Sequence, residues 1–205
     1  MHLEIVSPTP KSETKLSSKR GRKAKARLTA DDWIRVAGTV LAQEGIAAVR
    51  VEPLAAKLGV TKGSFYHHFP DRPALHRAIL DDWRRRATKG IISRLNENVT
   101  DARTRLMGVF SLPSRGQRAA EGANLELAIR LWAKNDNEAK RILQEVDEQR
   151  LDYIASLFEK MGLDQRNARA RAFILYASTM GHAMFSLDDL DTDLETITSQ
   201  LLDGF

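Results

Sequence analysis

Apolar residues recur at helical spacing along almost the whole chain after Thr29, and this pattern limits the fold more than any other feature. Thr29 is a typical helix N-cap, with Asp32 three positions later in the place that bonds back to it. The first apolar stripe ends at Gly45, a residue type that commonly terminates helices. No stretch alternates apolar and polar residues as a strand does. The pattern therefore predicts an all-α protein.

Glycine, proline and capping residues divide the remainder into further helices. Pro53 is compatible only with the first turn of a short second helix, and Gly59 allows a left-handed turn after it. Thr61 and Asp71 are expected to cap the third and fourth helices. The predicted helices after the first are Glu52–Leu58, Lys62–Phe69, a segment from Asp71 to about Glu97, Asp101–Leu112, Glu121–Lys134, Asp136–Met161, Gln165–Ser186 and Thr192–Leu202.

The composition excludes several classes of protein. The chain of 205 residues has no cysteine, which removes disulfides, thiol nucleophiles and thiolate metal sites. No window approaches the roughly 18–20 apolar residues of a membrane span. The N-terminal region lacks the apolar core of a secretory signal. We therefore expect a cytoplasmic protein with no membrane partner.

Positive charge is concentrated at one end of the sequence. Residues 1–80 carry 14 Lys/Arg against 7 Asp/Glu, whereas residues 81–205 carry 18 against 20. Residues 1–26 are polar and contain few large apolar groups, which predicts a disordered basic arm. The run KRGRKAKAR (Lys19 to Arg27) is either a solvated charge run or an arm that lies along a DNA backbone. A basic end of this kind attracts polyanions.

Leu54 to Phe69 has the composition of a helix-turn-helix. Two short helices that cross closely need small residues at the contact, and Ala55 and Ala56 are expected to supply them. The apolar residues expected to hold the pair together are Leu54, Leu58, Val60 and Phe65. The outward positions of the third helix are cations, hydroxyls, rings and a glycine, which suit phosphates and base edges.

The segment LAQEGIAAVRVEPLAAKLGVTKGSFYHHFPDRPAL resembles the N-terminal domain of the tetracycline-repressor (TetR) family of bacterial transcription regulators. The matching pieces are Leu54-Ala55, Gly59-Val60-Thr61, the run from Lys62 to Phe69, and Arg72. The resemblance implies a three-helix DNA-binding domain at residues 27–75 and a larger helical domain at residues 76–205. It also implies a homodimer on a near-palindromic double-stranded operator, and a small-molecule effector bound in the larger domain.

The resemblance further implies which residues contact DNA. Tyr66, His67 and Arg72 resemble phosphate-binding positions, and Lys62 resembles a contact to a phosphate or a guanine edge. For His68 both a DNA contact and packing under the helix end stay open. The complete expected set is Arg50, Thr61, Lys62, Gly63, Ser64, Tyr66, His67, His68 and Arg72.

Two positions depart from the family pattern. Where the second helix begins, Arg50 stands near the place of a Thr or Ser that caps the helix and binds a phosphate. Arg50 offers a longer cation there, but Glu52 would repel the DNA backbone if it points the same way. The linker Pro70-Asp71-Arg72 also carries one cation where two are common.

Other kinds of site are poorly supported. Adjacent helical residues point about 100° apart, so His67 and His68 cannot chelate one metal ion together. No Gly-x-Ser-x-Gly, Walker or Rossmann motif is present, and we expect neither enzymatic activity nor a cofactor. The acidic run from Asp188 to Asp193 is explained by helix capping and a solvated loop.

The C-terminal half is consistent with a regulator without identifying its signal. The segments Ile142–Gly162 and Gln165–Ser186 suit a dimer interface of two helices per subunit, although an ordinary monomer core is an alternative. A DNA-binding regulator controlled by a partner protein or by abundance, with no effector, is the alternative function. Residues that would line an effector pocket, or else belong to plain core, are Met107, Phe110, Trp132, Tyr176 and Met180.

Overall fold

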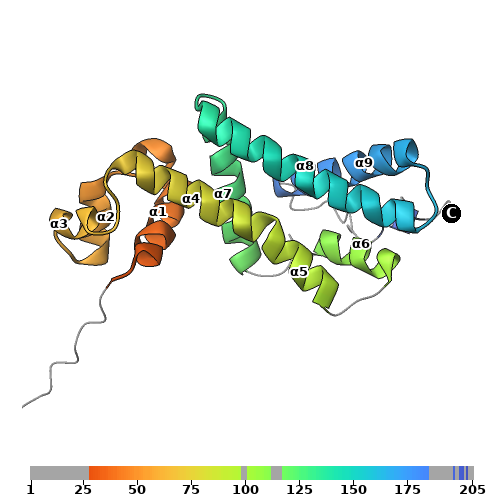
Figure 1. Cartoon of the computed structure of the whole chain (residues 1–205), viewed down its shortest axis with the longest axis horizontal. Coiled ribbons are helices and arrows are strands. Elements are labelled where there is room, and N and C mark those ends of the chain that lie inside the picture. Colours follow the sequence, from red (N-terminus) through yellow and green to blue (C-terminus); the bar gives the residue numbers. More distant parts are fainter. Residues whose placement is uncertain are drawn as a thin grey trace, which may run out of the picture.

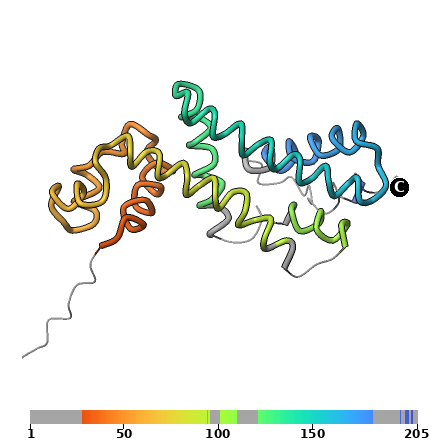
Figure 2. Tube along the Cα trace, in the orientation of Figure 1, coloured from red at the N-terminus to blue at the C-terminus, as the bar shows by residue number. Residues whose placement is uncertain are grey.

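The computed structural model describes residues 28–97, 101–111 and 117–184, and positions 196, 199, 200 and 202. Every regular element among these residues is a helix, as the apolar spacing predicts. The molecule is elongated, with the first three helices at one end and α9 at the other (Figures 1 and 2). None of the described helices is long and apolar enough to cross a membrane.

The N-terminal unit consists of α1 (Ala30–Glu44), a single 3-10 turn η1 (Ile46–Ala48), α2 (Val51–Leu58) and α3 (Lys62–Tyr66). The predicted capping box at the start of α1 is present, because Thr29 Oγ1 accepts from Asp32 N and the Asp32 carboxylate accepts from Thr29 N. The Thr29 bonds and Arg35 lower the pKa of Asp32 to about 2. The predicted end at Gly45 is also confirmed, with φ at 80°.

The predicted fourth helix is two helices, α4 (Arg72–Ala87) and α5 (Lys89–Glu97). Asp71 caps α4 as predicted, accepting from Ala74 N at 2.7 Å. The backbone leaves helical geometry at Thr88, where φ is −117° and ψ is −85°. The Thr88 hydroxyl donates to Arg84 O, and Arg150 Nε of a distant helix donates to Ala87 O. These two bonds satisfy carbonyls of the last turn of α4, so the helix can end there.

The chain continues with α6 (Ala102–Ser111), α7 (Gln117–Ala133), α8 (Asn137–Lys160) and α9 (Gln165–Met184). The predicted bounds of these four helices agree within a few residues, except that α7 begins four residues earlier than Glu121. Asp136 caps α8 by accepting from Ala139 N at 2.9 Å. The basic arm, the acidic run and most of the predicted helix Thr192–Leu202 lie outside the described residues, as do residues 112–116 between α6 and α7.

The buried side chains form two hydrophobic cores. The first joins α1 to α4 with α7 and the first half of α8, ending on α8 at Val146. The second joins α6, α9 and the second half of α8, beginning on α8 at Ile154. The first core therefore continues across the predicted domain boundary at residue 76.

A cluster of charged side chains lies between these cores, and we call it the seam cluster. Its members are Glu126 and Arg130 on α7, Asp147 and Arg150 on α8, and Tyr176 on α9. The Arg150 guanidinium lies 6.0 Å from the ring of Trp83, in the first core, and 5.8 Å from the ring of Tyr176, which packs on the second. Two cations thus balance two carboxylates in a largely buried place, as buried charges require.

Candidate nucleic-acid interface

The junction of α2 and α3 has the geometry of a helix-turn-helix. Gly59 adopts the left-handed conformation, with φ at 66° and ψ at 36°, and Val60 N donates to Ala55 O at 3.0 Å. This is the closure that lets a glycine end one helix and redirect the chain into the next. Ala55 is buried at the contact, as predicted, but the expectation for Ala56 is wrong because that residue is exposed. Ala56 points about 100° further round α2 than Ala55, which turns it away from the contact.

An aromatic group beneath α3 fixes its position. Phe65 is fully buried, its ring lies edge-on to Trp33 at 5.3 Å, and it stacks on Phe69 at 5.5 Å. The helix ends at Tyr66, and the last turn is tightened by His68 N, which donates to Phe65 O three positions before it at 2.9 Å. The predicted end at Phe69 is therefore three residues too late. Pro70 contributes, because it disfavours helical geometry in the residue before it.

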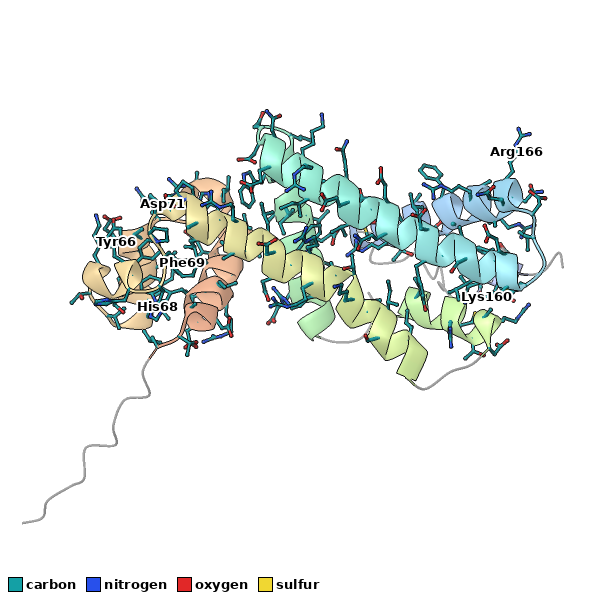
Figure 3. The ribbon with its side chains drawn as sticks, viewed as in Figure 1. Tyr66, His68, Phe69, Asp71, Lys160 and Arg166 are labelled. Carbon is teal, nitrogen blue, oxygen red and sulfur yellow. The ribbon has the colours of Figure 1, made fainter. Side chains whose placement is uncertain are left out.

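The outer surface of α3 and its flanking turn is polar and open. Tyr66 is 52% exposed, and Ser64 and His68 are half-buried. Figure 3 labels Tyr66, His68, Phe69 and Asp71 at this end of the molecule. The expected contact residues that are exposed here are Thr61, Lys62, Gly63, Tyr66 and His67. Five of the predicted residues are thus brought together on one short segment that α1 supports from below.

Glu52 and Lys62 form an ion pair that joins the first turn of α2 to the first residue of α3. Lys62 Nζ lies 2.5 Å from Glu52 Oε1, and both side chains are more than half exposed. The hydrogen bond from Lys62 lowers the pKa of Glu52, and the same bond raises the pKa of Lys62. Glu52 therefore points toward the expected DNA-facing cation.

Arg50 and Arg72 have different surroundings. Arg50 is exposed at the N-cap of α2, and its side chain makes no hydrogen bond or ion pair with any described residue. Arg72 is half-buried: its Nη2 donates to Ile46 O at 3.2 Å and its Nε donates to His76 Nε2 at 3.2 Å. Arg72 thus links α4 to η1, and the role predicted for it at a phosphate stays a prediction.

The residues predicted to line an effector pocket are divided between the two cores where their side chains are described. Met107 and Tyr176 pack on the second core, whereas Trp132 is buried in the first, edge-on to His76. Tyr176 uses its hydroxyl in the seam cluster, Met180 is half-buried, and the side chain of Phe110 lies outside the described residues. An open groove of about 600 Å³ between α1 and α7 includes Trp132 alone of the five.

The seam cluster is what sequence reasoning missed. Glu126 and Arg130 stand four apart inside the otherwise apolar run LELAIRLWA, which was the available signal of a buried pair. Nothing local indicated that Arg150 and Asp147 would reach them from another helix. Within the described part of the chain, no group of three or more His, Cys, Asp or Glu side chains could hold a metal ion.

Comparison with known proteins places this geometry in a context. Residues 34–79 match the model of the bacterial regulatory proteins of the tetR family. A tetR-family transcriptional regulator from Agrobacterium tumefaciens is similar in structure, with a TM-score of 0.67 and 20% identity over 84% of this chain and 95% of that one. The fatty acid degradation regulator FadR from Bacillus halodurans has a TM-score of 0.62 and 20% identity over 86% of this chain and 95% of that one.

A third similar structure is the ketosteroid transcriptional regulator KstR2 of Mycobacterium tuberculosis. Its TM-score is 0.58, with 14% identity over 84% of this chain and 90% of that one. A search of curated protein sequences finds no match. At these identities the structures establish a shared fold over most of the chain, and the similarity to the tetR family in sequence is confined to residues 34–79.

Proposed function

We propose, from the match of residues 34–79 to the tetR family of bacterial regulatory proteins, that the chain is a homodimeric, cytoplasmic repressor of transcription. In this proposal α3 enters the major groove of an operator, and a small molecule bound in the helical domain releases the protein from it. The proposed domains are residues 1–26, 27–75 and 76–205.

The observation that carries the proposal is the polar surface of α3 above a rigid aromatic support. Gly63 is exposed and lies next to the Thr61 hydroxyl, and the neighbouring Lys62 and Tyr66 are exposed as well. Such groups bind phosphates and base edges, and the stacked rings beneath prevent α3 from tilting.

The proposal is tested by selecting bound duplexes from a random DNA pool with the full chain. A dimer bound to one face of the DNA duplex should enrich two inverted half-sites whose centres are about 10 base pairs, or a multiple of 10, apart. Lys62→Ala and Tyr66→Phe should both weaken binding to the enriched site. Lys140→Ala, which removes the same charge from an exposed position of α8, is the matched control and should bind as the parent does. A pool without enrichment would contradict the proposal.

Dimerisation is supported by an apolar surface on α9. Phe173 is 63% exposed and Ile174 48% exposed, and Ala170 and Ala177 are exposed on the same helix. Large exposed apolar side chains grouped in this way are typical of protein interfaces. Sedimentation of Phe173→Glu should show a monomer where the parent is a dimer, and a parent that already sediments as a monomer would refute this part.

Control by an effector is separable from DNA binding. A ligand at 100 times its dissociation constant stabilises a protein by about 2.7 kcal/mol, which a thermal-shift screen detects. Compounds that stabilise the chain and release DNA support the proposal. A screen without such compounds favours the alternative, a regulator of the same fold controlled by a partner protein or by abundance.

A further inference from the structure

The ion pair between Glu52 and Lys62 stands on the surface that the proposed function assigns to DNA. Lys62 is the first residue of α3, and Glu52 reaches it from the first turn of α2 across ten positions of sequence. The Lys62 side chain is 53% exposed and the Glu52 side chain 62%, so water competes with the pair and either residue can exchange its partner. The ion pair therefore orients Lys62, but another anion can replace Glu52.

Resting on the proposed function, we propose that Glu52 is a positioning residue that occupies Lys62 and so reduces the sequence-independent affinity of this surface for DNA. A DNA phosphate and the Glu52 carboxylate are both anions, and they compete for the same ammonium group. If Lys62 stays with Glu52 in the complex, it neutralises no phosphate. If Lys62 moves to a phosphate, Glu52 is left unpaired and attracts a cation from solution, which offsets the cation that DNA releases.

Both routes give the same net count of released ions. Affinity for B-DNA falls with salt by about 0.9 logarithmic units per decade for each phosphate that a protein neutralises. Glu52 should therefore make the salt dependence shallower by about 0.9, the contribution of one phosphate contact. The advantage is selectivity, because weaker sequence-independent binding leaves more of the protein free to find its operator.

The surroundings of Glu52 define the alternative that has to be separated. Arg50 also lowers the pKa of Glu52, although less than Lys62 does, and its side chain makes no bond with a described residue. Glu52 could in principle act on Arg50, or simply repel the DNA backbone as an isolated charge. Only an action through Lys62 makes the effects of changing the two paired residues depend on each other.

The experiment is a double-mutant cycle on the full chain with Glu52→Gln and Lys62→Gln. The probe is a duplex of about 30 base pairs and arbitrary sequence, and its dissociation constant is measured between 50 and 200 mM salt. Glu52→Gln should steepen the salt slope by about 0.9, which makes its gain in affinity about 3.5-fold larger at 50 than at 200 mM. Lys62→Gln should leave the slope of the parent unchanged but remove the added slope from Glu52→Gln.

Glu44→Gln is the matched control, because it removes one carboxylate of an exposed ion pair, with Lys57 at 3.6 Å, in the same domain. Its slope should stay within experimental error of the parent. If Glu52→Gln changes the salt slope equally in the parent and in Lys62→Gln, the proposal is overturned. The effect of Glu52 would then act on Arg50 or arise from direct repulsion of the DNA backbone. An unchanged slope in Glu52→Gln overturns it as well, while salt-dependent binding by the parent still upholds the DNA-binding function. A parent that does not bind the duplex refutes both.

Discussion

Removing one carboxylate from the seam cluster should destabilise the protein strongly. Glu126 is 7% exposed and accepts from Arg150 through both oxygens, each at 3.0 Å, and from Arg130 at 2.9 and 3.2 Å. In Glu126→Gln two guanidinium groups remain with Asp147 alone, and Arg150 has no carboxylate partner. An uncompensated buried charge costs about 3–5 kcal/mol, a large share of the 5–15 kcal/mol that typically stabilises a protein.

The magnitude can be checked with urea unfolding followed by circular dichroism at one fixed protein concentration. Arg150→Met should cost about as much as Glu126→Leu, whereas the double variant should cost about 2 kcal/mol less than the sum, since it restores charge balance. Asp152→Asn is the control: its exposed partner Arg169 lies on α9, and the loss should stay below about 1 kcal/mol. A loss below 1 kcal/mol in Glu126→Gln, or strict additivity of the pair, would show that the cluster is not a coupled unit.

Three further predictions concern single positions. Gly63→Ala should raise stability by up to about 1 kcal/mol, because a Cβ at this position would meet only Thr61 Oγ1, at 3.7 Å. The same Cβ should weaken DNA binding, because it fills the space into which a DNA backbone would come. Unchanged affinity in a gel-shift titration would contradict this. Burial, and to a smaller extent Arg72, lower the pKa of His76 below its ordinary 6.5. The folded state therefore takes up a proton less readily than the unfolded state, and the free energy of unfolding should fall as pH drops below about 6.5. In urea titrations at pH 7 and pH 5, His76→Gln should show a smaller fall. Burial raises the pKa of Tyr176 from 10 to about 12, so stability should decline as pH rises from about 10 to about 12, and Tyr176→Phe should lack this decline; equal pH profiles would show that the hydroxyl is not buried among the arginines.

Local signals were sufficient for the N-terminal end of the molecule. The capping box at Thr29, the left-handed Gly59 and the cap at Asp71 each depend on a few neighbouring residues, and each is present as predicted. The polar surface of α3 follows from the same short stretch, because the positions of Phe65 and Phe69 determine which side of α3 faces the core.

Contacts between distant helices account for what was not predicted. The break at Thr88 depends partly on Arg150, which lies 63 positions from Ala87 and takes over its carbonyl. The position of Tyr176 in an ionic cluster depends on α7 and α8, whose charged residues are far from it in the sequence. Charged residues inside an apolar run indicate a buried ionic cluster, but its other members can be named only when the neighbouring helices are known.

The division of the core within α8 has a consequence for recombination between regulators. The helices α1 to α4 share one core with α7 and the first half of α8, up to Val146. A chimera that joins the first 75 residues of this chain to the remainder of another regulator would separate Leu75 and Trp33 from the α7 side chains in the same core. The structural unit that supports the helix-turn-helix is thus larger than the helix-turn-helix sequence motif. A chimera that keeps this core intact has to include α7 and the first half of α8 from the same protein, and the sequence of the other regulator should begin only after Arg150.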